Sequence, residues 1–396
     1  MMNILVINSG SSSIKYQLIQ MPNKQVICSG LVERIGLNNA QMHFKTNDSA
    51  IKKDLDVPNH HVGFEKVAEF LMNPNFGVIK DESEIHAVGH RVVHGGSTFS
   101  KTTIINESVK NKIKELFALA PLHNPPNYEG IEVSEAIFKS ATQIAVFDTA
   151  FHQTIPIEAY KYAIPNEFLN KHKIRVYGFH GTSHKYVSEK AKETLPNSSS
   201  KLITIHLGNG CSITAVKDGK SIDHSLGFGP MNGLIMGTRS GDIDQSIIFY
   251  LVNSLGYSLD DVNTLLQKKS GMQGLTGLSD LRDIESEASK GNKECQLALL
   301  MFAYRVKKYI GSYTAALNGV DAIVFTAGIG ENSILLRKMI CENMEYLGIE
   351  LDQNKNNVKA REILDVSKTD SKVKVLIIPT NEELEIAKQS YTLISQ

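Results

Sequence analysis

The sequence predicts an α/β protein built from two copies of one domain, and three observations support this. An apolar run at residues 202–205 is followed by a small-residue turn at 208–210 and a second β-type run at 213–216. The segment at 4–18 repeats this pattern 198 positions earlier, so that Ile7 falls on Ile205. A chain of 396 residues is also long enough for two domains with buried cores.

The two turns carry the first indication of function. Gly208, Asn209 and Gly210 form one, and residues 8–13 form a similar turn of small polar residues. Each needs either positive φ angles or a close approach of the backbone. Backbone N–H groups at such a tip bind anions such as phosphate, although an ordinary hairpin explains one turn equally well. Two of them indicate a duplicated domain with a nucleotide between the copies.

Composition excludes several classes of protein. Lysine plus arginine and aspartate plus glutamate both number 42, which gives no reason to expect nucleic acid or an anionic membrane as partner. The four cysteines have no C-x-x-C spacing, which favours free thiols in a reducing cytoplasm and no structural zinc. No signal-peptide pattern occurs, and the apolar stretch at 297–304 is too short to span a bilayer. We therefore expect a cytoplasmic protein.

In the N-terminal half the expected elements, in order, are strand 26–32, strand 41–45, a polar surface segment 46–61, helix 62–72, strand 85–90, helix 108–120 and strand 144–147. Glycines on both sides place Arg91 on a bend, as suits a guanidinium aimed at phosphate or carboxylate. A surface arginine beside a turn is the alternative. Asp148 follows a strand at the edge where α/β folds bind ligands, but a helix cap has the same pattern.

In the C-terminal half the expected elements are helix 242–255, a helix capped by Ser258 and Asp261 that ends before Gly271, helix 296–317, strand 321–326, helix 334–347, strand 373–378 and a closing helix from 379–383. His180 lies between two glycines, where a structural role is the alternative to a catalytic one. A long glycine-containing loop at 226–241 presents Arg239.

The glycine-rich segment at 327–333 follows a strand and precedes a helix, which is the layout of a nucleotide contact at a helix N-terminus. Its spacing does not match G-x-G-x-x-G with a following acidic residue, and G-x-x-x-x-G-K-[ST] is absent from the sequence. A dinucleotide oxidoreductase and a P-loop protein are therefore excluded.

From the first hairpin to the last helix, the chain resembles the acetate kinase family. The matching motifs are VINSGSSSIKY, GHRVVHGG, APLHNP, FDTAFHQT, YGFHGTSH, HLGNG, MGTRSGDID, TAGIGENS and PTNEEL. The resemblance implies two duplicated actin-like (ribonuclease H-like) domains with a cleft between them. One would comprise 1–149 plus 383–396. The other, 150–382, would carry most of the nucleotide site and the dimer interface.

The resemblance also implies a homodimer that reversibly transfers the ATP γ-phosphoryl group to acetate, with Mg²⁺, or Mn²⁺ in its place. Asn8 and Glu382 would hold the metal. Lys15 would lie near the ATP phosphates, and the catalytic residues would be Asp148, His180, Arg239 and Arg91. Nucleotide contacts would come from His206, Leu207, Gly208, Asn209, Gly210, Asp280, Leu281, Arg282, Gly328, Ile329, Gly330, Glu331 and Asn332. The acyl pocket would be lined by Arg91, Val93, Leu122, Phe179 and Pro230.

The chain departs from the family pattern at 223–233. The family has D-T-S-M-G-x-T-P-L-E-G there, and this chain has D-H-S-L-G-F-G-P-M-N-G. The segment before Asp280 is also about one residue short. Pro230 and Arg239 are kept, and the nucleotide motifs at 280–282 and 328–332 favour ATP over a phosphate donor without adenosine.

Two alternatives remain open. A propionate kinase would share the mechanism and have a larger acyl pocket, whereas an actin-like ATPase would have no small-molecule acceptor. Arg91 and Arg239 favour a kinase, because a conformational switch needs no carboxylate site. A carboxylate substrate is already a nucleophile, so a metal-binding or electrostatic role suits Asp148 better than that of a base.

Overall fold

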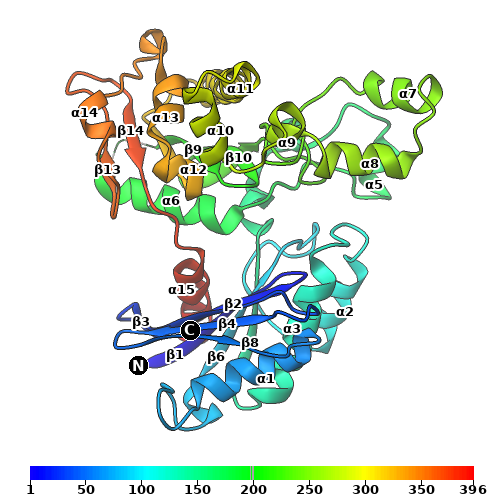
Figure 1. The fold of residues 1–396 in the computed structure, drawn as a ribbon, viewed down its shortest axis with the longest axis vertical. Coiled ribbons are helices and arrows are strands. Elements are labelled where there is room, and N and C mark those ends of the chain that lie inside the picture. Colours follow the sequence, from blue (N-terminus) through cyan, green and yellow to red (C-terminus); the bar gives the residue numbers. More distant parts are fainter. Residues whose placement is uncertain (197, 199) are drawn as a thin grey trace. The chain divides into compact units, whose positions relative to one another are not determined.

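The computed structural model describes residues 1–196, 198 and 200–396. It divides into two compact units, Met1–Phe151 with Asn381–Gln396, and His152–Thr380. Each unit contains a sheet flanked by helices (Figure 1). The boundaries expected from the resemblance assign Asn381 and Glu382 to the second unit. Both lie in the first instead, because helix α15 (Glu382–Ile394) packs on the sheet of that unit.

The first unit is built on an eight-stranded sheet in the order β5-β4-β3-β2-β1-β6-β8-β7. Strands β1, β6 and β8 are parallel, and the other pairings are antiparallel. The strands are β1 (Met2–Ser9), β2 (Ser13–Met21), β3 (Gln25–Glu33), β4 (Gln41–Thr46), β5 (Ala50–Asp54), β6 (Ala87–Val92), β7 (Thr103–Ile104) and β8 (Thr142–Phe147).

The second unit has a six-stranded sheet in the order β11-β10-β9-β12-β14-β13. Its strands are β9 (Lys201–Leu207), β10 (Cys211–Lys217), β11 (Lys220–His224), β12 (Ala322–Thr326), β13 (Leu364–Asp365) and β14 (Lys374–Ile377). Strands β9, β12 and β14 are parallel, and β10 and β11 continue the sheet antiparallel. This repeats the arrangement of β3-β2-β1-β6-β8, so the predicted duplicated actin-like fold is confirmed.

The duplication holds at the level of single residues. Strand β1 ends at Ser9 and β2 begins at Ser13, while β9 ends at Leu207 and β10 begins at Cys211, in each case 198 positions later. The glycines of the second turn have no positive φ. A Cβ on Gly210 would lie 3.4 Å from the ring of His180, an ordinary van der Waals contact, so neither expected reason explains this glycine.

Helices cover both faces of the first sheet, because alternate residues of β1 are apolar in both directions. Leu5 faces the core beneath α1 and α3, and Ile4 faces the core beneath α15. The helices of this unit are α1 (His60–Leu71), α2 (Glu107–Glu115), α3 (Asn124–Ile137) and α15, with short 3-10 turns at Glu82–Glu84 and Ala150–Thr154, the second of which continues into the other unit.

In the second unit, α6 packs on β9 and β12, and the long helix α11 packs on β9 and β10. Helix α6 follows the strands of the first unit in the sequence but packs in the second. Helix α15 follows the strands of the second unit but packs in the first (Figure 1). The helices are α4 (Ile157–Tyr160), α5 (Asn166–Asn170), α6 (Gly181–Thr194), α7 (Ser246–Asn253), α8 (Leu259–Lys268), α9 (Gly271–Thr276), α10 (Leu281–Ser289), α11 (Lys293–Leu317), α12 (Ala327–Asn332), α13 (Ile334–Cys341), α14 (Gln353–Asn356) and the 3-10 turn Glu345–Leu347.

Several local expectations are wrong in instructive ways. The polar segment 46–61 contains the edge strand β5, whose largely exposed side chains leave no alternating pattern. The glycine-rich segment after β12 is the helix α12 rather than a turn, and the helix expected over 334–347 ends at Cys341. The capping box of Ser258 with Asp261 at the start of α8 is confirmed. None of the helices in the described part of the chain combines the length and the hydrophobicity that a membrane span requires.

Candidate active site

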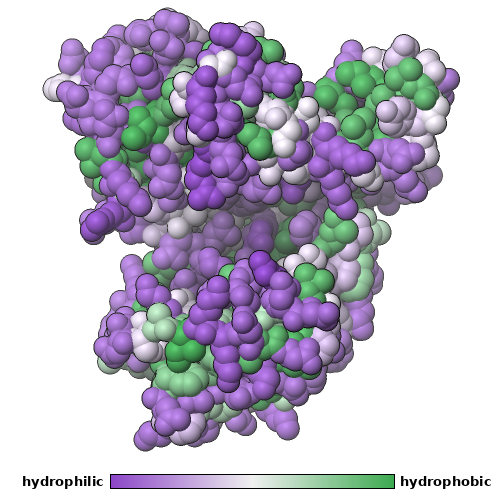
Figure 2. Space-filling model, viewed as in Figure 1, coloured by the Kyte–Doolittle hydropathy of each residue, from purple (hydrophilic) through white to green (hydrophobic). Residues whose placement is uncertain are grey.

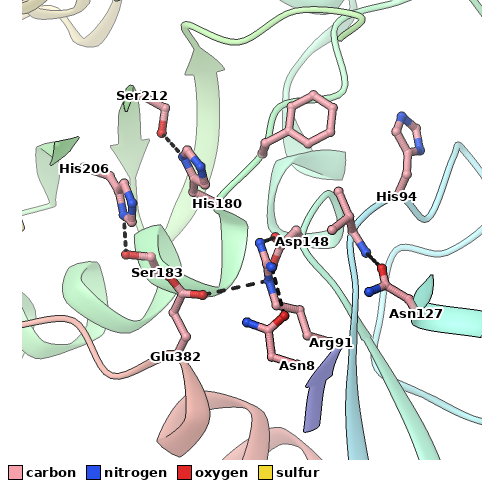
Figure 3. Close-up of polar contacts among 12 residues, drawn as sticks. Asn8, Arg91, His94, Asn127, Asp148, His180, Ser183, His206, Ser212 and Glu382 are labelled. Atoms are coloured by element: carbon pink, nitrogen blue, oxygen red, sulfur yellow. Dashed lines mark hydrogen bonds and ion pairs between the residues drawn. The ribbon is translucent and has the colours of Figure 1, made fainter. Parts of the chain in front are cut away.

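A charged cluster lies where the parallel strands of the first unit end. Asn8 belongs to β1, Arg91 to β6, Asp148 follows β8, and Glu382 is the first residue of α15. Arg91 Nη1 donates to Asn8 Oδ1 at 3.2 Å, and its Nη2 donates to a carboxylate oxygen of Asp148. Arg91 Nε lies 3.9 Å from Glu382 Oε2. In Figure 3 these three side chains point toward one guanidinium.

The glycines on both sides of Arg91 predict that it lies on an exposed bend. This prediction is wrong, because Arg91 lies within strand β6. Its side chain is 20% exposed and that of Asp148 is 1% exposed. Burial lowers the pKa of Arg91, but the carboxylates of Asp148 and Glu382 outweigh this effect and raise it. The arginine therefore stays charged, and it neutralises a carboxylate that would be costly to bury alone.

The acidic side of this cluster carries more charge than its cations neutralise. Lys15 on β2 lies opposite Asn8 in the sheet and forms an ion pair with Glu383 at 2.5 Å. Burial is the main factor that raises the pKa of Glu382 to about 7 against the opposing effect of Arg91, and the carboxylate of Asp148 adds to it. Burial thus disfavours the charged form of Glu382, and Arg91 partly offsets this effect.

The segment after β6 is held by two buried asparagines of α3. The N–H of Val93 donates to Asn127 Oδ1 at 3.0 Å (Figure 3). The N–H of His94 donates to Asn124 Oδ1 at the same distance. Asn127 also donates to the carbonyl of Ser9 at 2.6 Å. Val93 is buried, whereas the side chain of Leu122 is 58% exposed. Sequence reasoning missed both asparagines, although Asn124 lies within the motif APLHNP.

In the second unit, His180 occupies the N-cap of α6 in the left-handed region, with φ 54° and ψ 27°. This conformation is strained for a residue with a side chain and recurs at functional sites. Its ring stacks on His206, with centroids 4.3 Å apart, and His180 Nδ1 bonds to Ser212 Oγ at 2.8 Å (Figure 3). His206 in turn bonds to Ser183 Oγ at 2.8 Å. The imidazole is therefore held in one orientation.

Arg239 is presented by the loop between β11 and α7. Its Nη1 donates to the carbonyl of Pro230 at 2.8 Å, and burial lowers its pKa. The loop is tied to α11, because Arg305 donates to the carbonyls of Gly233 and Asp242. Unlike Arg91, Arg239 forms no ion pair with a carboxylate in the part of the chain that the structure describes.

The departure from the family pattern at His224 has a structural explanation. His224 Nε2 accepts the backbone N–H of Phe179 at 3.1 Å, and its Nδ1 bonds to Thr214 Oγ1 at 2.7 Å. Burial, reinforced by neighbouring histidines, lowers its pKa well below the ordinary value, so the ring is neutral. His224 therefore fixes the backbone of Phe179, one of the residues expected at the acyl pocket.

A cavity of about 730 Å³ lies within the second unit, which suits a nucleotide. Eight of the expected nucleotide contacts line it: Gly208, Asn209, Asp280, Leu281, Arg282, Gly328, Ile329 and Asn332. Sequence reasoning missed six further lining residues, Gly237, Met272, Ser279, Glu285, Phe302 and Ser333. A Cβ on Gly237 would lie 2.1 Å from Asn209 Oδ1, so a larger residue there would displace the Asn209 side chain.

Five expected contacts do not line this cavity and support it instead: His206, Leu207, Gly210, Gly330 and Glu331. Leu207 is fully buried. The carboxylate of Glu331 accepts the N–H of Thr380 at 3.0 Å, and burial raises its pKa. The carbonyl of Gly330 accepts from the buried Arg337 at 2.9 Å, which anchors α12 to α13. Lys15 belongs to the first unit.

Two units of one topology, with charge at the strand ends of the first and a glycine-lined cavity in the second, are the layout of an actin-like phosphotransferase. The model of the acetokinase family matches residues 3–388, and the chain belongs to this family.

The relatives extend over the whole chain. An acetate kinase of Flavobacterium johnsoniae is 65% identical over 393 residues, 99% of this chain and 100% of that protein. One of Treponema denticola is 54% identical over 397 residues, with the same shares covered. The crystal structure of Porphyromonas gingivalis acetate kinase has a TM-score of 0.94 and 43% identity, covering 100% of both chains. A propionate kinase from Francisella tularensis has a TM-score of 0.92 and 46% identity, covering 98% of this chain and 99% of that one. The resemblance inferred from the motifs is confirmed, and the protein is an enzyme of the kinase class.

Proposed function

We propose that this protein transfers the γ-phosphoryl group of ATP to acetate, reversibly and in line, giving acetyl phosphate and ADP. The observation that carries the proposal is the Arg91 cluster at the strand ends of the first unit, in a chain 65% identical to an acetate kinase. The cavity of the second unit, lined by Gly208, Asn209 and Gly328, would take the nucleotide.

The chemistry accounts for the two arginines. A carboxylate that attacks a γ-phosphoryl group brings two anions together, so the enzyme must neutralise charge and align the reacting groups. An arginine in this role contributes roughly 10³–10⁵ in rate, or about 4–7 kcal/mol. We assign this role to Arg91 and Arg239, with His180 as a hydrogen-bond donor. Asp148 holds Arg91 in place and needs no role as a base.

Asn8 and Glu382 would hold Mg²⁺, or Mn²⁺ in its place, with Asp148 beside them. The donor set fits, because Mg²⁺ prefers carboxylate and carbonyl oxygens and takes few protein ligands. No group of three or more histidine, cysteine or acidic side chains among the described residues is arranged as a metal site. When bound, the ion would neutralise phosphate charge.

We also propose a cytoplasmic homodimer that associates through the second unit. Exposed apolar residues on and around α7 and α8 form what we call the α7–α8 patch: Ile247, Phe249, Tyr250, Leu255, Tyr257 and Leu259. Figure 2 shows hydrophobic residues gathered over α7. Monomers rarely expose large contiguous apolar patches. The four cysteines are buried free thiols, which suits a reducing compartment. Light scattering after size-exclusion chromatography should give twice the chain mass.

Propionate is the alternative acceptor, because a structural neighbour at 46% identity is a propionate kinase. The test is ATP turnover with acetate, with propionate and with neither, with the acyl phosphate trapped by hydroxylamine. We expect acyl hydroxamate formation that requires the carboxylate and is fastest with acetate, and that stops when EDTA is added. ATP hydrolysis without any acceptor as the main activity would contradict the proposal and favour an actin-like ATPase.

A further inference from the structure

A chain of buried hydroxyl and imidazole groups lies behind His180 in the second unit. Thr204 Oγ1 on β9 bonds to His184 Nδ1 at 2.7 Å, and His184 Nε2 bonds to Ser212 Oγ on β10 at 2.7 Å. Ser212 Oγ also bonds to His180 Nδ1 at 2.8 Å (Figure 3). Thr204, His184 and Ser212 are fully buried, so solvent does not compete for these bonds.

The charge state of His184 limits how this chain of groups can carry its protons. Burial, reinforced by His152 and His206, lowers the pKa of His184 well below the ordinary value, so this ring is neutral with one N–H and one bare nitrogen. Each of its nitrogens meets a hydroxyl. The protons can therefore run from Thr204 toward His180, from His180 toward Thr204, or from both rings onto Ser212 Oγ, which leaves the serine hydroxyl proton unused.

The cost of an unused buried donor decides among them. Within the described part of the chain, His184 is the only hydrogen-bonding partner of the Thr204 hydroxyl. If His184 donated to Thr204, the threonine hydroxyl would keep an unused donor in the interior, which is unfavourable. If Thr204 donates, then His184 Nε2–H donates to Ser212, and every donor is used only when Ser212 donates to His180 Nδ1.

We propose that Thr204, His184 and Ser212 are positioning residues that fix the proton of His180 on Nε2. Nδ1 of His180 accepts a hydrogen bond, so Nε2 carries the N–H that is directed at the transferring phosphoryl group. The identification of the phosphoryl group as the acceptor of this hydrogen bond rests on the proposed function, whereas the assignment of the tautomer does not. The stacking of His206 on the ring then fixes the direction of that N–H.

Kinetics test the role of the chain. Ser212→Ala should lower kcat on the order of tenfold and leave the KM for ATP unchanged, because the interaction acts in the transition state. Thr204→Val keeps the shape and removes the hydroxyl, so kcat should fall severalfold. Thr204→Ser keeps the hydroxyl and should retain the activity. If Thr204→Val instead kept a higher kcat than Thr204→Ser, the shape of the side chain rather than its hydrogen bond would matter, and the proposed role of Thr204 would be wrong.

Nitrogen-15 spectra of the histidine rings test the tautomer without turnover. We expect the Nε2–H form of His180 in the native protein and a mixture of both tautomers in Ser212→Ala. Thr214 lies directly opposite Thr204 in the sheet and bonds to His224, so Thr214→Val is the control and should leave the His180 tautomer unchanged. An Nδ1–H form in the native protein would overturn this inference, whereas a protein without acetate-dependent turnover would overturn the proposed function.

Discussion

The two units carry different kinds of side chains at the equivalent ends of their parallel strands. The parallel pairing places Ile7 beside His90 in the first sheet and Ile205 beside Phe325 in the second, so the residues that follow occupy equivalent places. At these ends the first unit carries an amide and two charged side chains, Asn8, Arg91 and Asp148. At the equivalent places the second unit carries an imidazole and two hydroxyl groups, His206, Thr326 and Thr380.

The first residues of the two closing helices show the same contrast. Helix α15 has Glu382, Glu383 and Glu385 in its first turn, whereas α6 has no acidic residue there. One scaffold has therefore been specialised in two ways. We expect charge at the strand ends of the first unit to serve phosphoryl transfer, and the glycine-lined cavity of the second to serve nucleotide binding.

The largest effect should come from Arg91. Arg91→Ala should lower kcat by about three decades or more. Because it leaves the buried carboxylate of Asp148 without its cation, it should also lower the free energy of unfolding by about 3–5 kcal/mol. Arg91→Lys keeps the charge and should fold more stably while still losing most of the activity. Arg361→Ala, at an exposed arginine outside both sites, is the control. Steady-state kinetics and thermal melts measure both effects.

Arg239→Ala should lose activity to a similar extent, about three decades, but with less destabilisation. Arg239 bonds to a carbonyl and pairs with no carboxylate among the described residues, so its removal leaves no buried counterion. Its loss should reduce the free energy of unfolding by about 1 kcal/mol. If Arg239→Ala had a lower melting temperature than Arg91→Ala, the buried carboxylate beside Arg91 would not be the main source of destabilisation.

Gly328→Ala should act on the nucleotide alone. A Cβ there meets no protein atom within 4 Å, and Gly328 lines the cavity in helix α12. The methyl group should raise the KM for ATP about tenfold, as expected when about 1.4 kcal/mol of binding is lost. Alanine is the better helix former, so the melting temperature should stay the same or rise. An unchanged KM would remove Gly328 from the site.

The smallest effect concerns the acyl group. Val93→Ala should improve kcat/KM for propionate relative to acetate, by on the order of 1–3 kcal/mol in discrimination. Val92→Ala is a matched control, since Val92 is equally buried but packs in the core with Phe99 and Phe147. It should lower stability without changing the ratio. Equal ratios for both variants would show that Val93 does not face the acyl group.

The sequence predicted most of the fold, because apolar strands and small-residue turns repeat at a fixed spacing. It missed β5, whose exposed side chains give no alternating pattern, and α12, whose glycines disfavour a helix that only tertiary packing completes. The residue pattern itself singled out Arg91 and Asp148, and the resemblance supplied Glu382. It could not supply Ser212 or Asn127, because a hydroxyl or an amide acquires its role only through a partner that the fold brings near.

The most direct test of the division between the units is the equilibrium binding of ADP, measured by calorimetry, to Arg91→Lys and Gly328→Ala. We expect Gly328→Ala to bind ADP about tenfold more weakly yet to keep most of its kcat at saturating ATP. Arg91→Lys should bind ADP within about twofold of the native protein and lose most of its kcat. If instead Arg91→Lys lost ADP affinity as strongly as Gly328→Ala, the separation of transfer chemistry from nucleotide binding would be contradicted.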